Sequence, residues 1–336
     1  MRISLCIPTY NRAPQLQELL DSIACQIGYE LPVEIVISDN ASTDDTPAVV
    51  ERYRAAGMPI VYEILPENMG FDRNIMNSVE RASGEYCWLC GSDDILEPGA
   101  FAKVEAALRD NPVVAGLSVG SQGYNSDLSQ TIFVNDHIST EFAVDTVLAG
   151  REQIIGSIGA WMGFISSLVV RRSLWLDAAH GSDVTPYLRG YIHLYLVARM
   201  LDERSTWLCV PDRLVGCRIG NESFKPKDEF ARTRLDIVGY DLAFGDVLGR
   251  NDAAYHQAMA KVAGFYIKTH FLTAKMAGAS SRYWWQAIPT SLSYYWRYPI
   301  FWTRILPIAL MPRTAMLVVR SIFRRTLKPL ILKKFA

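Results

Sequence analysis

The stretch Ile3-Ser-Leu-Cys-Ile-Pro-Thr-Tyr-Asn-Arg12 joins an apolar segment to a polar loop, and it sets the fold of the N-terminal part of the chain. The apolar side chains of Ile3, Leu5 and Ile7 recur with period two, which predicts a β-strand that ends at Pro8. Behind the loop, leucines and isoleucines between residues 16 and 27 recur at spacings of three and four, which predicts an amphipathic helix.

The same order of strand and helix continues to residue 90. Apolar runs predict three further strands at 33–37, 60–64 and 86–90. Helical patterns lie between them, around Val49 to Tyr53 and from Ile75 to Ala82. This rhythm predicts an α/β fold in which helices flank a mostly parallel sheet.

Composition bounds the class of protein. The chain has 336 residues, of which half are hydrophobic, with 34 basic and 35 acidic side chains. It is too apolar for a disordered protein, and it has no repeat of the fibrous or solenoid kind. We expect three regions: residues 1–115 and 116–225 as the two halves of one α/β domain, and residues 226–336 as a helical C-terminal region.

Ligands of parallel sheets bind where the strands end, so the loops there matter most. The first of these loops has neither the GxGxxG fingerprint nor a P-loop, which argues against the usual dinucleotide oxidoreductases and ATPases. After the fourth strand, Asp93 and Asp94 could supply oxygen ligands to Mg²⁺ or Mn²⁺. An isolated Asp-Asp pair is more often a solvated turn, and Asp39 alone is more often a helix cap.

Four segments in order resemble the motifs of family 2 glycosyltransferases with the Rossmann-like GT-A fold. They are Ile7-Pro-Thr-Tyr-Asn-Arg12, Ile37-Ser-Asp-Asn-Ala-Ser-Thr-Asp44, Asn68-Met-Gly70 with Arg73-Asn74, and Gly84-Glu-Tyr86 running into Ser92-Asp-Asp94. The resemblance implies a metal-dependent enzyme that takes its sugar from a nucleoside diphosphate. This sequence departs from the family pattern at Gly91 or Ser92, where members of the family often have another Asp. The number of protein carboxylates that would bind the metal therefore stays open.

The resemblance also implies roles for single residues. Asp39 is expected to bond the base, Arg73 to lie near the sugar, Asp94 to bind the metal, and Asp93 to contact the ribose or sugar and share the metal. The donor site is implied to comprise Pro8, Thr9, Tyr10, Asn11, Asp39, Asn68, Arg73, Ser92 and Asp93.

The middle of the chain is expected to bind the acceptor. Residues 156–163, rich in glycine, predict a flexible loop before a strand at 165–170. Trp161 within it could stack on a sugar ring or belong to the core. A helix from Leu194 to Leu201 follows Tyr191, a second acceptor candidate, and His193. Many relatives have an acidic base at this helix start; here His193 is the candidate base, and Asp183 competes with it.

A narrower resemblance concerns the substrate. Tyr86-Cys-Trp-Leu89, residues 166–175, Tyr191 with His193, and Cys217-Arg-Ile-Gly-Asn-Glu-Ser-Phe224 are similar to the abequosyltransferase branch. That branch adds a 3,6-dideoxyhexose from a CDP donor to a polyprenyl-diphosphate-linked oligosaccharide in O-antigen synthesis. The alternatives are a GT-A transferase that uses a UDP- or GDP-sugar on another acceptor, and an inactive membrane-bound scaffold of transferase fold. A sugar nucleotidylyltransferase would need a Gly-rich loop after the first strand, which is lacking.

The end of the chain is basic and aromatic. From Ala253 onward there are 13 basic residues and no acidic one. Lys261, Lys268, Lys275 and Arg282 recur every seven residues, which places them along one side of a helix. Together with Trp and Tyr pairs on short, proline-broken helices, they predict that 261–336 docks on an anionic membrane surface. A helical cap on the acidic half is the alternative; nucleic acid is not expected.

The location is predicted from three features. No uncharged run beyond Tyr283 reaches the ~18 to 20 apolar residues of a spanning helix. The six cysteines lie mostly in apolar runs, which suits a reducing compartment, and Met1 leads directly into a strand rather than a signal peptide. We therefore expect a peripheral protein on the cytoplasmic face of the bacterial inner membrane.

Overall fold

The computed structural model describes residues 2–26, 33–132, 137–220 and 228–322. The chain divides into two compact units, residues 1–223 with 242–255, and residues 224–241 with 256–336. Both predicted halves of the α/β domain fall in the first unit, up to Ser223. Residues 242–255, expected in the C-terminal region, also belong to the first unit.

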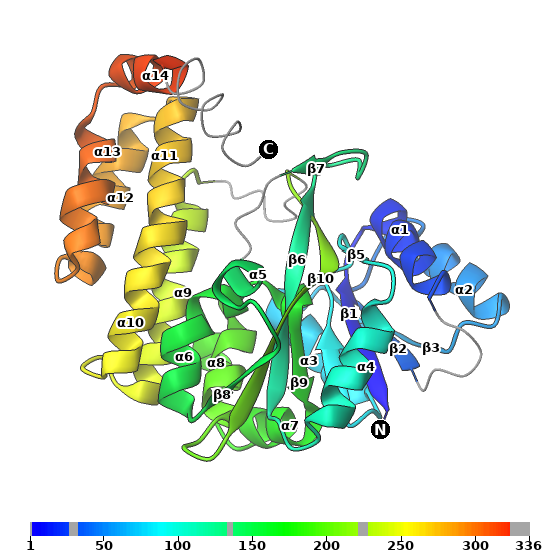
Figure 1. The fold of residues 1–336 in the computed structure, drawn as a ribbon. Coiled ribbons are helices and arrows are strands. Elements are labelled where there is room, and N and C mark those ends of the chain that lie inside the picture. The colour runs from blue at the N-terminus through cyan, green and yellow to red at the C-terminus, as the bar shows by residue number, and fades with distance from the viewer. Residues whose placement is uncertain (1, 27–32, 133–136, 221–227, 323–336) are drawn as a thin grey trace. The chain divides into compact units, whose positions relative to one another are not determined.

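One sheet organises the first unit (Figure 1). Its main path runs in the order β3-β2-β1-β4-β9-β6-β10-β5, while β7 pairs with β6 and β8 pairs with β10. The strands are β1 (Ile3–Thr9), β2 (Val33–Asp39), β3 (Ile60–Ile64), β4 (Tyr86–Leu89), β5 (Ile95–Leu96), β6 (Gly116–Tyr124), β7 (Thr131–Ile132), β8 (Thr146–Ala149), β9 (Leu168–Arg171) and β10 (Thr206–Arg218).

The long strands are mostly parallel, as the alternation of strands and helices predicted. β1 pairs in parallel with β2 and β4, β2 with β3, and β6 with β10. Every residue of β1 and β2 is buried, which is the pattern of strands covered on both faces. The short β9 is antiparallel to both of its neighbours, β4 and β6, and joins the two halves of the sheet.

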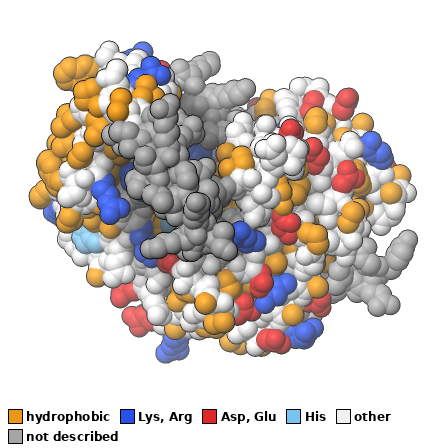
Figure 2. Space-filling model, turned by 45° about the horizontal axis from the view of Figure 1, so that its top comes forward, with side chains coloured by type: hydrophobic (Ala, Val, Ile, Leu, Met, Phe, Trp, Pro, Cys, Tyr) orange, Lys and Arg blue, Asp and Glu red, His pale blue; other side chains and the backbone are white. Residues whose placement is uncertain are grey.

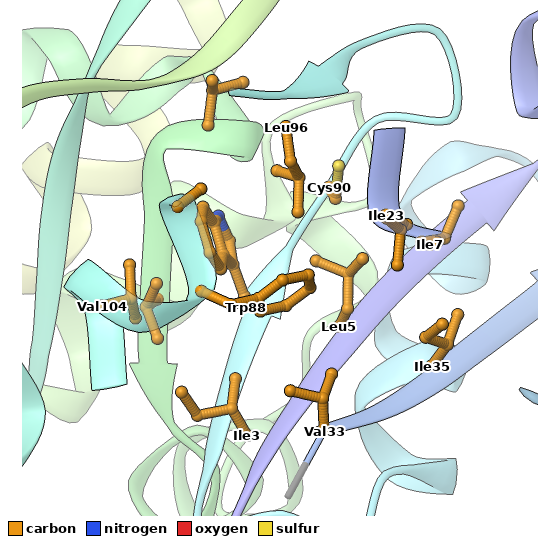
Figure 3. Packing of buried hydrophobic residues seen from close by; sticks show 14 of the residues in the cluster. Ile3, Leu5, Ile7, Ile23, Val33, Ile35, Trp88, Cys90, Leu96 and Val104 are labelled. Atoms are coloured by element: carbon orange, nitrogen blue, oxygen red, sulfur yellow. The ribbon is translucent and has the colours of Figure 1, made fainter. Parts of the chain in front are cut away.

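Helices of the first half agree with the predicted patterns. These are α1 (Ala13–Ala24), α2 (Thr46–Ala55) and α3 (Phe71–Arg81); a fourth helix, α4 (Ala100–Asp110), lies where no helix was predicted. The predicted apolar face of α1 is buried against the sheet. Figure 3 shows Trp88 of β4 among the packed side chains of β1, β2 and α4, and its indole Nε1 donates to the carbonyl of Ser166 at 2.9 Å.

The glycine-rich segment 156–163 is helical, so the prediction of a flexible loop is wrong. It forms the end of α6 (Arg151–Ile158) and a 3-10 helix, η1 (Gly159–Gly163). A Cβ on Gly159 would lie 3.0 Å from Ile155 and 3.1 Å from the ring of Phe244. The glycine therefore permits close packing rather than flexibility.

The strand predicted at 165–170 begins later than expected, at Leu168. Residues 165–167 form a 3-10 turn, η2 (Ile165–Ser167), in which the Ser167 hydroxyl donates to the Phe164 carbonyl. Beyond β9 lie α7 (Arg172–His180), η3 (Thr185–Tyr187) and α8 (Ile192–Met200); α5 (His137–Glu141) precedes β8. Eight of the nine residues of α8 are buried, which makes it a core helix.

The second unit is helical. The described helices beyond residue 230 are α9 (Ala231–Leu248), whose residues from Leu242 onward belong to the first unit, α10 (Ala253–Val262), which belongs to the second unit from His256 onward, the π-helix η4 (Ala263–Ile267), α11 (Lys268–Ala277), α12 (Ser281–Tyr295), the π-helix η5 (Phe301–Ile305), α13 (Leu306–Leu310) and α14 (Arg313–Ile322). Within the part of the chain that the structure describes, none of these helices has the length and hydropathy that crossing a bilayer requires.

Two expectations about this unit are wrong. Arg282 does not share a helix with Lys275, because Gly278 adopts a left-handed conformation that ends α11. Pro289 does not break α12, whose buried stripe of Tyr283, Ala287, Ser291 and Tyr295 continues past it. Tertiary packing of that stripe offsets the one backbone hydrogen bond that proline removes.

Candidate active site

The candidate site lies at the carboxyl ends of β1 and β4. These strands are neighbours in the sheet, yet the chain visits β2 and β3 between them on the other side of β1. Such a reversal of strand order opens a crevice in which parallel sheets bind ligands. The loop from Pro8 to Arg12 leaves β1 there, and the turn from Gly91 to Asp94 follows β4.

Asp94 is held from two distant segments. Its side chain is buried, and its Oδ2 accepts a hydrogen bond of 2.5 Å from the Ser166 hydroxyl. Its Oδ1 accepts from the backbone N–H of Arg218 at 3.3 Å. Burial, together with the adjacent charge of Asp93, raises the pKa of Asp94 to about 7. The carboxyl group is thus fixed in place and costly to ionise without a cation.

Asp93 is more exposed than Asp94 and pairs with an arginine. Its Oδ2 lies 2.7 Å from Nη1 of Arg12, which is itself 9% exposed. The Arg218 guanidinium donates to the Asp93 carbonyl at 3.0 Å and also bonds Glu18. Two buried guanidinium groups therefore stand beside the carboxylate pair, where they could also meet the phosphates of a nucleotide.

The donor set fits a small divalent cation in a limited way. A Cβ on Gly91 would lie only 3.1 Å from Asp94 and 3.2 Å from Asp93, so glycine leaves the space beside both carboxylates open. Among the described residues no group of three or more His, Cys, Asp or Glu side chains could hold a metal. Mg²⁺ is commonly bound by one or two carboxylates completed by substrate phosphates, and this pair suits that arrangement.

Side-chain amides and carboxylates connect the loops of β1 and β2. Asn11, with a left-handed φ of 49°, accepts from the backbone N–H of Thr43 at 2.7 Å, and its own N–H donates to Ser42. Asp44 accepts from the N–H of Ala13 at 3.0 Å, where α1 begins. These bonds keep the two loops in one arrangement.

Asn40 and Asn68 connect the loop after β2 with the segment before α3. The amide of Asn40 donates to Asn68 Oδ1 at 2.9 Å and its oxygen accepts from Met69 at 2.8 Å. Asn68 also accepts from the N–H of Gly70, whose φ of 84° suits glycine. The predicted donor residues Asn11 and Asn68 thus shape the site through their own hydrogen bonds.

Asp39, predicted to bond the base, is fully buried. Its two oxygens accept from the Tyr62 hydroxyl at 2.7 Å and from the Ser42 N–H at 2.8 Å. Burial and the bond to Asp39 raise the pKa of Tyr62 well above its ordinary value. A base that bonds Asp39 must therefore share the carboxylate with these donors.

The other predicted donor residues differ in exposure. Thr9 is buried at the end of β1, and its hydroxyl makes no hydrogen bond to the described residues. Pro8 and Ser92 are also buried, whereas the Tyr10 side chain is 43% exposed. Arg73 is exposed at the start of α3. Tyr10 and Arg73 are therefore open to a ligand, as are the exposed Asn11 and Asn68.

The structure brings together two of the four predicted acceptor-side residues. His193 and Tyr191 have ring centroids 5.6 Å apart, and Phe71 from α3 packs edge-on against His193 at 6.4 Å. Trp161 instead stacks on His137 at 3.5 Å. Asp183 lies in an exposed turn, where it accepts from the N–H of Thr185 and its pKa is lowered by hydrogen bonds from that residue.

His193 is 1% exposed, and neither ring nitrogen makes a hydrogen bond of normal geometry to the described residues. Burial lowers its pKa to about 4, although the nearby backbone of Met162 and Gly163 opposes the shift. The imidazole is therefore neutral at pH 7, but it is a weaker base than an ordinary histidine.

Sequence reasoning named neither Ser166 nor Arg218 nor Arg12 as a site residue. All three stand in runs that carried the family resemblance, which was the available signal. Their contacts with Asp93 and Asp94 span 72 to 125 residues of chain, so they depend on the order of strands in the sheet. Local patterns do not contain that order.

Comparison with known proteins agrees with this geometry. Residues 4–166 match the family described as Glycosyl transferase family 2. Abequosyltransferase RfbV of Salmonella typhimurium is 34% identical over 261 residues, covering 75% of this chain and 77% of that protein. Poly(ribitol-phosphate) β-N-acetylglucosaminyltransferase TarS of Staphylococcus aureus is 34% identical over 126 residues, which is 37% of this chain and 22% of TarS.

A solved structure supports the fold. The crystal structure of S. aureus TarS 1-349 in complex with UDP-GlcNAc superposes with a TM-score of 0.60 at 17% identity, covering 88% of this chain and 80% of that one. The predicted GT-A fold and the abequosyltransferase-like resemblance are confirmed. The chain, with its paired carboxylates at the strand-order reversal, belongs to glycosyltransferase family 2.

Proposed function

We propose that this protein transfers a sugar from a nucleoside diphosphate to a hydroxyl group of a lipid-linked oligosaccharide. The observation that carries the proposal is the pair Asp93 and Asp94 at the strand-order reversal, held by Ser166, Arg218 and Arg12. Two carboxylates in a buried turn could hold a divalent cation, and the guanidinium groups of Arg12 and Arg218 lie beside them. Such cationic groups neutralise the negative charge that develops on a departing nucleoside diphosphate.

Asp94 and Asp93 are the residues that would hold Mg²⁺ or Mn²⁺. When bound, the metal supplies positive charge against the diphosphate leaving group. The protein's own contribution is orientation: Ser166 and the Arg218 backbone fix Asp94, and Arg12 fixes Asp93. Tyr10, exposed in the loop after β1, and Arg73, exposed in the first turn of α3, are proposed to contact the nucleotide and its sugar.

The proposed donor and acceptor derive from the relative. Because RfbV is an abequosyltransferase, we propose a CDP-linked 3,6-dideoxyhexose as donor and a polyprenyl-diphosphate-linked oligosaccharide of O-antigen synthesis as acceptor. A UDP- or GDP-sugar remains the alternative donor, since few pocket residues separate related sugars. A scaffold without activity is the alternative class, and the intact carboxylate pair argues against it.

Calorimetric titration tests the donor site. CDP, UDP and GDP are titrated with and without Mn²⁺ into the wild type and Asp94→Asn. We expect metal-dependent binding of CDP that weakens at least tenfold in the variant. Preference for UDP or GDP would replace the donor, and a folded protein that binds none of them would refute catalysis and leave the scaffold.

Removal of each candidate base tests the acceptor side. In an inverting reaction the base contributes about 10²- to 10⁴-fold. His193→Ala or Asp183→Ala, whichever is the base, should lower kcat by at least a hundredfold with CDP affinity unchanged. If neither does, and the product retains the anomeric configuration of the donor, no such base is needed.

We further propose that 261–336 docks peripherally on an anionic membrane, at the cytoplasmic face of the inner membrane. Among its described residues, Trp285 is 81% exposed, Trp296 54% and Trp302 49%. The Arg297 guanidinium lies 5.3 Å from the Trp296 ring. Figure 2 shows hydrophobic side chains together with Lys and Arg on the helical second unit. Tryptophan favours the headgroup region, and the excess of basic residues complements anionic lipid.

Vesicle co-sedimentation tests the docking. Phosphatidylcholine vesicles with and without phosphatidylglycerol are compared for the wild type, for a Trp285→Ala/Trp302→Ala variant, and for Val113→Ala, an exposed apolar control at 81% exposure in the first unit. We expect binding to anionic vesicles that the double variant weakens at least tenfold and the control leaves unchanged. Equal, weak binding of all three proteins would contradict the membrane role.

A further inference from the structure

The start of α8 lacks a capping side chain of its own. Tyr191 precedes the helix without a side-chain hydrogen bond to it, and no acidic residue stands in the first turn. Gly190, just before it, has a φ of 99°, a left-handed conformation that glycine adopts without strain. The first N–H groups of a helix have no partners within it, so acceptors must come from elsewhere.

Asp72 of α3 supplies an acceptor for the first N–H of α8, that of Ile192, and also bonds the N–H of Gly190, two residues before the helix. Its Oδ2 accepts from the N–H of Gly190 at 2.5 Å, and its Oδ1 accepts from the N–H of Ile192 at 3.1 Å. The side chain is buried, with the residue 7% exposed. A carboxylate at this place also interacts favourably with the positive end of the α8 dipole. Burial raises the pKa of Asp72, and the two N–H groups oppose that shift.

The same contact joins two functional segments. Asp72 lies between Phe71 and Arg73, directly after the loop that carries Asn68. Ile192 lies between Tyr191 and His193, and Phe71 packs edge-on against the His193 ring. One carboxylate thus holds the predicted donor segment against the segment with the predicted acceptor residues.

We infer that Asp72 is a positioning residue for sugar transfer: it fixes the start of α8, and with it Tyr191 and His193, relative to the donor loop. This inference rests on the proposed function for the identity of the two substrates. It differs from simple helix capping because it predicts an effect on the transfer step that exceeds the effect on folding or nucleotide binding.

The test compares Asp72→Asn with a capping control, Asp252→Ala; alanine is used there because asparagine would keep the single oxygen that accepts both bonds. Asp252 Oδ1 also accepts from two backbone N–H groups, those of Ala254 at 2.7 Å and Tyr255 at 3.2 Å, where α10 begins. Transfer is followed as acceptor-dependent CDP release from CDP-abequose, with a polyprenyl-diphosphate oligosaccharide as acceptor. CDP affinity is measured with Mn²⁺, and amide hydrogen exchange reports on residues 190–194 and 253–256.

We expect Asp72→Asn to lower kcat at least tenfold, to keep CDP affinity within threefold, and to speed exchange at 190–194 at least tenfold. Asp252→Ala should keep kcat and CDP affinity within threefold and speed exchange only at 253–256. Asp72→Glu, which keeps the charge and both acceptor oxygens, should recover at least part of the lost kcat.

Three results would overturn the inference: unchanged exchange at 190–194, a kcat within threefold of the wild type, or a parallel loss of kcat and CDP affinity. If neither Asp72 variant folds, the residue serves folding and the inference also fails. If the wild type binds no nucleotide, the proposed function fails, while hydrogen exchange still decides whether Asp72 holds α8.

Discussion

Replacing Ser166 with alanine removes a hydroxyl that bonds two residues of the turn after β4, Gly91 and Asp94. Ser166 is fully buried, donates to Asp94 at 2.5 Å and accepts from the N–H of Gly91 at 2.9 Å. Alanine leaves both partners in place without this hydroxyl. Because the lost atoms amount to a single oxygen, the change in packing is small and the loss of hydrogen bonds dominates.

The magnitude is set by these two bonds. A hydrogen bond to a charged group contributes about 1.5–3 kcal/mol, and an unpaired buried N–H costs about 1–3 kcal/mol. We expect the free energy of unfolding to fall by about 3 kcal/mol, which lowers Tm by about 6–12 °C for a unit of this size. If about half of this free energy is also lost from the binding of nucleotide and metal, nucleotide affinity falls about tenfold.

Ser167→Ala is the matched control. The Ser167 hydroxyl is also buried, yet it makes one neutral hydrogen bond, to the Phe164 carbonyl at 2.8 Å. Its loss should cost about 1 kcal/mol and leave nucleotide affinity within twofold. Thermal unfolding and calorimetry with CDP and Mn²⁺ measure both effects. The reasoning is refuted if Ser166→Ala binds CDP as tightly as Ser167→Ala does.

Three further changes test other features. Because burial lowers the pKa of His193 from 6.5 to about 4, the wild type should lose up to about 3 kcal/mol of stability relative to His193→Gln as the pH falls through that range, as measured by urea unfolding of both proteins; a difference that does not change with pH would contradict the lowered pKa. Gly159→Ala places a methyl group 3.1 Å from the Phe244 ring and should lower the free energy of unfolding by about 1–3 kcal/mol; an unchanged Tm would contradict close packing there. Asn11→Ala and Asn11→Gly both lose the bond to Thr43, but only alanine is strained at a φ of 49°. Urea unfolding should therefore show a free energy of unfolding about 1 kcal/mol lower for Asn11→Ala than for Asn11→Gly, and equal values would mean that the backbone carries no strain there.

Local patterns were sufficient for the first half of the fold. The strand predicted at 60–64 has those bounds in the structure, and the apolar face of α1 is buried as its spacing indicated. Each of these elements depends on neighbours within one turn or on a run of consecutive residues. The loops of the candidate site could be located for the same reason, because the end of a strand fixes where its loop emerges.

Contacts between residues far apart in the sequence could not be predicted from local patterns. Ser166 and Arg218 meet Asp94 only because β9, β6 and β10 add to the sheet beside β4, and no periodicity encodes that order. Glycine was ambiguous for a related reason: residues 156–163 predicted flexibility, whereas Gly159 serves close packing with Phe244, distant in sequence. The cap from Asp72 to α8 likewise joins residues 118 and 120 positions apart.

The hydrogen bonds of the asparagines between the site loops limit which residues can change when the donor specificity of such an enzyme changes. Asn11, Asn40 and Asn68 each use their side chains to hold neighbouring loops, so a substitution there disturbs several backbone segments at once. The Tyr10 side chain, 43% exposed, makes no hydrogen bond of that kind to the described residues. Selection in the laboratory for a different donor should therefore enrich changes at Tyr10 while the asparagines persist.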